Sequence, residues 1–156
     1  MKKLVDIVEK VQTKLGIFFL SLYLFCALLQ IIGRYFHWSV PWTEEVSNYS
    51  FIWAAFMGSS IMLRQEGGHF SLTALKDKLI ASNRSTKLLD IIIYSLLLLF
   101  SILVFFYGIQ LVMQFKNWRL SSLPSVKQWI IWLCMPIAGA TTCLYSLEGL
   151  VNAIRK

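Results

Sequence analysis

Residues 91–115 have the sequence IIIYSLLLLFSILVFFYGIQLVMQF, which is 25 residues without a charged side chain. At 1.5 Å per residue, a helix of this length measures about 38 Å, whereas the hydrocarbon core of a bilayer is about 30 Å thick. The stretch therefore predicts a helix that crosses a membrane and tilts or projects beyond the hydrocarbon. It decides the fold class, because a segment this apolar needs lipid as its solvent.

Three further stretches of the chain, each at least 18 residues long, also lack Asp, Glu, Lys, Arg and His. They are Leu15–Gly33, Val46–Leu63 and Gln128–Leu147. About 20 apolar residues cross a bilayer once as a helix, so the chain has room for four crossings and little else. The sequence thus predicts a single all-α membrane domain, 1–156. Its four transmembrane helices are expected at about residues 15–34, 44–64, 90–116 and 128–148.

The formal net charge of +7 results from 15 Lys and Arg against 8 Asp and Glu. Eleven of the 15 basic residues fall in three segments: the N-terminus, the connection between the second and third predicted spans, and the C-terminus. The two alternate connections hold Arg34, Lys116, Arg119 and Lys127. Basic residues beside spans stay in the cytoplasm, which predicts that both termini are inside. The basic excess therefore indicates topology and does not indicate a nucleic-acid partner.

The cytoplasmic connection Arg64–Asp90 is the longest. After Gly67-Gly68 it carries apolar residues at roughly helical spacing among lysines. This pattern predicts a short amphipathic helix between the second and third spans, lying on anionic lipid headgroups. Residues 1–14 have similar spacing and predict a short amphipathic lead-in at the inner interface.

The outer connection predicts how the second span begins. Pro41 is tolerated at a helix start, and Thr43 can then cap the helix. Glu44 and Glu45 follow in the first turn, where the helix dipole favours anions. Within the fourth predicted span, Pro136 predicts a kink.

Neither a catalytic site nor a cofactor site is evident. His37 and His69 are assigned to opposite faces of the membrane, so they cannot ligate one haem, and no carboxylate pairs with either at a metal-site spacing. None of the four stretches carries an ionisable residue of the kind that usually marks a transport pathway. We therefore expect no enzyme activity, no cofactor and no transport by the chain alone. The alternatives are an independent small four-helix secondary transporter and a membrane anchor of an enzyme complex.

The most specific pattern extends from Arg34 to His69. Its elements are Arg34-Tyr35, Pro41-Trp42-Thr43-Glu44-Glu45, Tyr49-x-x-x-Trp53, Phe56-x-Gly58 and Gly68-His69. With its four predicted spans and inside termini, the chain resembles the small membrane (Q-type) subunit of a TRAP (tripartite ATP-independent periplasmic) transporter. The resemblance covers nearly the whole chain, although its specific residues are concentrated in residues 34–69.

The resemblance implies a permease subunit in the bacterial inner membrane. Such a subunit is a scaffold for a large, elevator-type membrane subunit that holds the substrate and sodium sites, and it helps to receive a periplasmic substrate-binding protein. The expected partners are thus the large subunit, the binding protein and membrane lipids. The implied activity is sodium-driven uptake of a carboxylated solute, either a sialic acid or a C4-dicarboxylate, and overall resemblance favours the sialic acid type.

Two groups of residues receive expected roles from this resemblance. The first, expected at structural or subunit interfaces, consists of Arg34, Glu44, Glu45, Trp53, Gly58 and His69. The second, expected to meet acidic patches on the binding protein, consists of Lys116, Arg119 and Lys127.

Simpler roles remain as alternatives for several of these residues. Arg34 is expected at nearly the same depth as Glu44 and Glu45, near the outer surface of the membrane, so an ion pair between Arg34 and one of them is expected. The alternative is that Arg34 snorkels to the surface and that the glutamates belong to a helix N-cap. Gly58 belongs to an Ala54-x-x-x-Gly58 pattern that permits close helix packing, either within this chain or on a partner. His69 is expected to make a capping or headgroup contact rather than to relay protons. For the three outer cations, the alternative is an ordinary solvated loop.

Overall fold

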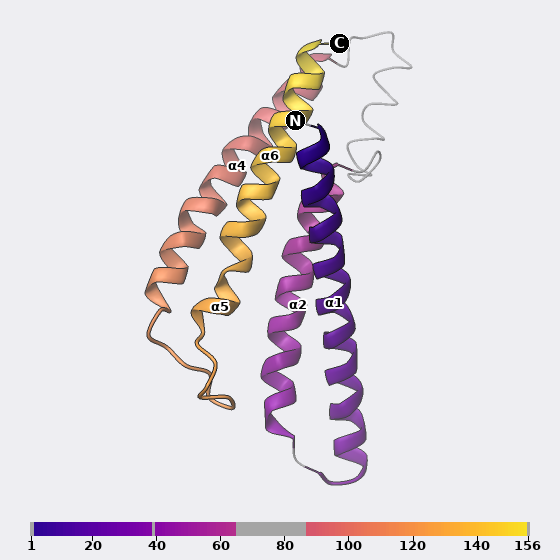
Figure 1. The fold of residues 1–156 in the computed structure, drawn as a ribbon, viewed down its shortest axis with the longest axis vertical. Coiled ribbons are helices and arrows are strands. Elements are labelled where there is room, and N and C mark those ends of the chain that lie inside the picture. Colours follow the sequence, from indigo (N-terminus) through magenta and orange to yellow (C-terminus); the bar gives the residue numbers. More distant parts are fainter. Residues whose placement is uncertain (1, 39, 65–86, 156) are drawn as a thin grey trace.

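Five helices account for most of the described chain in the computed structural model, which describes residues 2–38, 40–64 and 87–155 (Figure 1). They are α1 (Lys2–Tyr35), α2 (Pro41–Met62), α4 (Lys87–Gln114), α5 (Trp129–Trp132) and α6 (Cys134–Arg155). These residues contain no β-strand, and one isolated bridge joins Arg119 to Lys127. The predicted all-α class is confirmed.

The helices form two antiparallel pairs, α1 with α2 and α4 with α6 (Figure 1). The two pairs pack on each other chiefly through α2 and α6. They lie close together at the end that carries both chain termini, here called the terminal end. They diverge toward the loop end, where the α1–α2 turn and the loop at residues 115–128 lie. Termini at one end are consistent with an even number of crossings, and the cytoplasmic location of that end stays a prediction.

Three helical segments in the described residues are long and apolar enough to cross a membrane: Val5–Tyr35, Asp90–Gln114 and Trp129–Ile154. The second predicted span, Val46–Leu63, lies mostly in α2, which does not meet this standard. The physical reason is its serines and asparagine, several of which are buried against the rest of the chain. Helix α2 has 22 residues, about 33 Å, and it packs along α1. The count of four spans therefore remains a prediction.

Helix α1 is longer than the sequence predicted. It has 34 residues, about 51 Å, and is continuous through the segment expected to be a separate lead-in. That expectation was wrong because Gln12 is buried, 3% exposed, and hydrogen-bonded to α6, so the segment packs into the bundle. The amphipathic helix expected in the connection between the second and third spans falls largely at residues 65–86, outside the described residues.

Glycines allow α4 and α6 to approach backbone to backbone. A Cβ atom on Gly108 would lie 2.8 Å from the backbone nitrogen of Pro136, and one on Gly139 would lie 2.8 Å from that of Phe105. The fourth predicted span is interrupted at Leu133, between α5 and α6, three residues before Pro136. Because proline has no N–H, it cannot donate the hydrogen bond that would continue a helix from α5.

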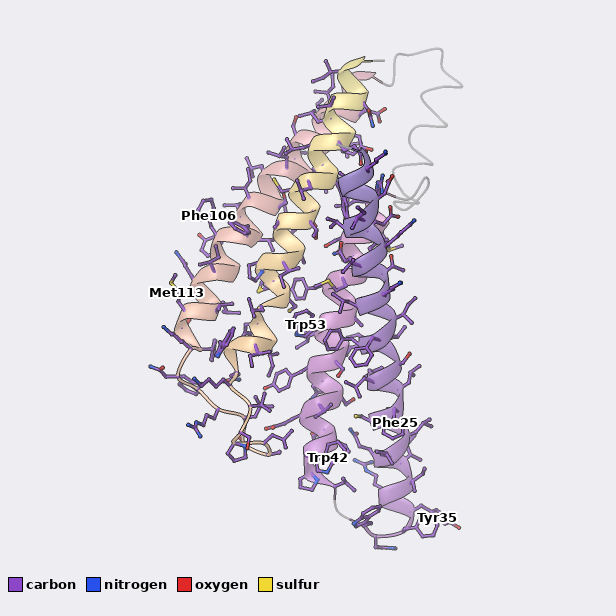
Figure 2. All side chains as sticks on the ribbon, in the orientation of Figure 1. Phe25, Tyr35, Trp42, Trp53, Phe106 and Met113 are labelled. Atoms are coloured by element: carbon purple, nitrogen blue, oxygen red, sulfur yellow. The ribbon has the colours of Figure 1, made fainter. Side chains whose placement is uncertain are left out.

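The outer faces of α1 and α4 are covered with exposed apolar side chains. Phe25 and Tyr35 project from α1 and Phe106 and Met113 from α4, all away from the other helices (Figure 2). Several buried polar side chains, among them Gln12, Ser60 and Thr141, instead lie where α1, α2 and α6 meet. The described chain is thus apolar outside and partly polar inside, which suits a lipid or protein environment around it.

Candidate functional site

Arg64 joins three helices at the terminal end. It follows the end of α2, and its backbone N–H donates to the Ile61 carbonyl (3.0 Å). The guanidinium Nε donates to Glu148 Oε2 on α6 (3.2 Å), while its two Nη groups donate to Glu9 and Asp6 on α1. We call these four residues the Arg64 clamp. A planar guanidinium with five N–H donors suits such a three-way contact better than an ammonium would.

The Arg64 clamp carries an excess of negative charge, because three carboxylates surround one guanidinium. Arg64 and Glu148 are mostly buried, whereas Asp6 is half exposed. The hydrogen bond to Asp6, together with the charges of Glu148 and Glu9, raises the pKa of Arg64 against the opposing effect of burial. The described residues hold no group of His, Cys, Asp and Glu that could bind a metal ion. We interpret the clamp as a structural contact that holds the ends of α1, α2 and α6 together.

Polar side chains continue from the clamp into the bundle. Tyr145 Oη donates to Gln12 Oε1 (2.8 Å), and Gln12 Nε2 donates to Thr141 Oγ1 (3.1 Å). Beside them, Thr142 Oγ1 donates to Ser60 Oγ (3.0 Å), which links α6 to α2. In an apolar environment these groups have few other partners, so their mutual bonds help to fix the helix register.

Sequence reasoning missed both the clamp and this buried network. The charges at the helix ends looked like ordinary interfacial residues, and nothing in the chain showed that α2 ends between α1 and α6. One sign was available: Gln12, a polar residue, occupies an apolar position in the pattern of residues 1–14. A polar residue at a helical core position usually has a polar partner.

Glu45 connects the loop end of α2 to the loop at residues 115–128. Its Oε2 accepts a hydrogen bond from the backbone N–H of Ser122 (3.1 Å), and Gln128 Nε2 lies 3.5 Å from its acceptor, Tyr49 Oη. Lys116, Arg119 and Lys127 are all exposed on this loop. The structure thus brings the three predicted docking residues to one rim.

Glu44 faces a different way and lines a pocket with Arg34 at the α1–α2 turn. Helix α2 begins at Pro41, with Val40 rather than Thr43 as its N-cap residue. The Thr43 hydroxyl instead donates back to the Val40 carbonyl (2.7 Å). Within the described residues, Arg34 forms no ion pair with either glutamate. Arg34 and Glu44 therefore line the same pocket without forming the expected ion pair.

The other predicted interface residues have separate positions. Trp53 stacks on Phe19 of α1, with ring centroids 4.8 Å apart, and so helps to hold the first helix pair together. A Cβ atom on Gly58 would meet nothing within 4 Å among the described residues, so none of them covers that side of α2. His69 lies outside the described residues.

Comparison with known proteins decides the family. The family model described as "Tripartite ATP-independent periplasmic transporters, DctQ component" matches residues 23–156. The chain belongs to this family. It is also 36% identical over 80 residues to a Haemophilus influenzae protein named as a TRAP transporter small permease. That match covers 51% of this chain and 49% of the relative, so the chain spans about half the length of the curated relative it matches. No solved structure matches the chain.

Membership in the DctQ family makes this chain a component of a transporter and, with its apolar helices, a multi-pass membrane protein. The matched region begins at Tyr23, in the middle of α1. Arg64, Glu148 and the pocket residues lie inside it, whereas Asp6, Glu9 and Gln12 lie before it. The two clamp residues on α1, Asp6 and Glu9, therefore lie outside the region that the family model matches.

Proposed function

We propose that this DctQ component is a non-catalytic scaffold that binds and stabilises a large, elevator-type membrane subunit. In this proposal it also helps to dock a periplasmic substrate-binding protein at the loop end. The complete transporter then takes up a carboxylated solute, a sialic acid or a C4-dicarboxylate, driven by sodium ions bound in the large subunit. The complex resides in the bacterial inner membrane.

The observation that carries the proposal is the pair of apolar faces on α1 and α4. In the most apolar 18-residue segment of α1, only 6% of the residues are buried within the described chain. The corresponding shares are 11% for α4 and 44% for the segment that includes α6. Helices α1 and α4 lie on opposite flanks of the molecule (Figure 1). One face can contact the large subunit while the other contacts lipid, which is the arrangement a scaffold at the side of a larger protein needs.

The absence of ionisable residues from the middle of the apolar stretches supports a scaffold over a self-contained transporter. Ion-coupled transporters usually place such residues at midplane sites. In the described residues, Gln12, Tyr145 and Thr141 are buried but bond to one another. These mutual hydrogen bonds favour a packing role for the three side chains over solute binding.

The exposed cations at the loop end support the docking role. Lys116, Arg119 and Lys127 are exposed on one loop, and Glu45 ties that loop to α2. Rim charges of this kind chiefly change the rate at which charged partners meet and its dependence on salt. The binding protein should therefore present acidic patches to this rim.

Co-purification tests the scaffold role. The tagged chain is expressed with the large membrane protein encoded beside it, with an unrelated multi-pass membrane protein carrying the same tag as control. A stable one-to-one complex is expected. Solute transport by the reconstituted chain alone would favour the independent transporter instead, and a bound cofactor visible by absorbance would favour an enzyme anchor.

Stopped-flow association with the binding protein tests the docking role. A variant with Lys116, Arg119 and Lys127 all changed to Ala should associate roughly tenfold more slowly at low salt and lose most of its salt dependence. An association rate that changes neither with the salt concentration nor with the triple substitution would refute the docking role.

A further inference from the structure

The α1–α2 turn lines an open pocket of about 510 Å³ whose walls carry opposite charges. Arg34 contributes from the end of α1 and Glu44 from the first turn of α2, and both are exposed. Gly33 permits this shape, because a Cβ atom there would lie 2.8 Å from the Trp38 carbonyl oxygen. The chain can therefore fold back over the end of α1, where the Trp38 N–H donates to the Gly33 carbonyl (2.8 Å).

One side of the pocket is rich in hydrogen-bond donors. Besides the Arg34 guanidinium, the lining includes Gln30, whose Nε2 is buried and has no hydrogen-bond partner among the described residues. A buried amide donor without a partner costs free energy, so it indicates a missing acceptor. His37 also lines the pocket, held at a φ of 55°, a backbone conformation that is uncommon for a residue other than glycine. An anionic group of the ligand fits this side.

Glu44 supplies an acceptor on the other side. Its carboxylate forms no ion pair within the described chain, although Arg34 lines the same pocket. Two opposite charges that line one pocket without pairing can each bind the complementary charge of a zwitterion. A cation with N–H donors suits a carboxylate better than a quaternary ammonium does, because it also donates hydrogen bonds.

Apolar side chains surround the pocket and indicate an amphiphilic ligand. Ile31, Ile32 and Phe36, next to the pocket in sequence, are between 48% and 72% exposed. Trp38, which lines the pocket, is 68% exposed. Such aromatic and aliphatic groups at the end of a membrane helix lie at the depth where lipid headgroups meet acyl chains.

We propose that this pocket binds the headgroup of phosphatidylethanolamine. The phosphate accepts hydrogen bonds from Arg34 and Gln30, the ammonium donates to Glu44, and the acyl chains lie along the exposed end of α1. Phosphatidylcholine has no N–H to donate to Glu44, and phosphatidylglycerol has no cation at all. The lining residues all belong to this chain, so the proposal can be tested without the large subunit and separately from the proposed scaffold role.

Native mass spectrometry of the full chain tests the proposal. The protein is equilibrated with equal amounts of the three phospholipids and then washed with detergent before the retained lipid is measured. Phosphatidylethanolamine should be retained roughly tenfold more than either other lipid, which matches the loss of one charge-assisted contact. Arg34→Ala and Glu44→Gln should each reduce its retention by about tenfold.

Two matched variants provide controls. Arg119→Ala removes an exposed arginine at the same end of the molecule, and Glu45→Gln changes the neighbouring carboxylate that faces Ser122. Both should retain phosphatidylethanolamine as the unchanged chain does. Equal retention of all three lipids, or equal losses in control and pocket variants, would overturn the proposal. So would displacement of the lipid by free phosphoethanolamine, which would indicate a soluble zwitterion as the ligand. Lower thermal stability in the pocket variants with unchanged lipid retention would likewise overturn it.

Discussion

Adding one methyl group at Gly139 tests how closely α4 and α6 approach each other. A Cβ atom there would lie 2.8 Å from the Phe105 backbone nitrogen and 2.9 Å from its Cα. Carbon contacts are most favourable at about 3.5 Å, so α4 must move by about 0.7 Å to admit the methyl group. Because the obstructing atoms belong to the backbone of a helix, the shift has to involve the whole α4–α6 contact.

The matched substitution is Gly58→Ala on α2, where the added Cβ would meet nothing within 4 Å. Both substitutions replace a helical glycine by alanine and therefore share a gain of about 1 kcal/mol in helix propensity. The difference between the two variants then isolates the overlap at Gly139. Overpacking of this kind costs about 1–3 kcal/mol, so Gly139→Ala should be less stable than Gly58→Ala by that amount.

The assay is thermal unfolding of the two variants and the unchanged chain in one detergent. With about 2–4 °C per kcal/mol for a chain of this size, the two melting temperatures should differ by several degrees. The Gly58→Ala variant should melt at or above the temperature of the unchanged chain. Equal melting temperatures for the two variants, or a more stable Gly139→Ala, would refute the close approach of α4 and α6.

Three further predictions concern the polar contacts. Arg64→Ala leaves three carboxylates facing one another and should cost about 2 kcal/mol of stability, measured by thermal unfolding. Since the pKa of Arg64 is raised above its ordinary value, its contribution is lost only as the pH rises through that higher pKa, so the deficit should be the same at about pH 7 and pH 10. Gln12→Leu removes the partner of the Tyr145 hydroxyl and should cost about 1–2 kcal/mol, again measured by thermal unfolding. Glu45→Ala should speed amide hydrogen exchange at Ser122 by roughly tenfold without changing the melting temperature of the bundle.

The apolar stretches predicted where the helices lie but not where all of them end. The sequence of α1 contains no residue that stops a helix between Lys2 and Tyr35, and yet its charged start looked like a surface segment. What extends the helix into the bundle is a contact with α6, more than 100 residues away, through Gln12 and Thr141. The one local sign of this contact is the polar Gln12 at an apolar position, and it does not indicate which distant residue is the partner.

The two neighbouring glutamates show the same limit for the candidate site. Pro41 and the residues that follow predicted both glutamates in the first turn of α2, but only Glu44 lies there, and Glu45 follows it. Successive residues of a helix differ by 100° in direction, so Glu44 faces the pocket and Glu45 faces the 115–128 loop. Which glutamate meets the pocket and which meets Ser122 depends on how the neighbouring segments are arranged around α2.

The Arg64 clamp joins α1, α2 and α6 near the terminal end. From there the two helix pairs diverge toward the loop end (Figure 1). Helix α2 has 22 residues, so it extends about 33 Å from the clamp toward the loop end. A rotation of α2 by about 5° about the clamp would move the loop end of this helix by about 3 Å, the length of one hydrogen bond. Two hydrogen bonds from α2, through Glu45 and Tyr49, oppose such a movement at the far end. A change at the Arg64 clamp should therefore alter the spacing between the cationic rim and the α1–α2 turn at the other end of the helices.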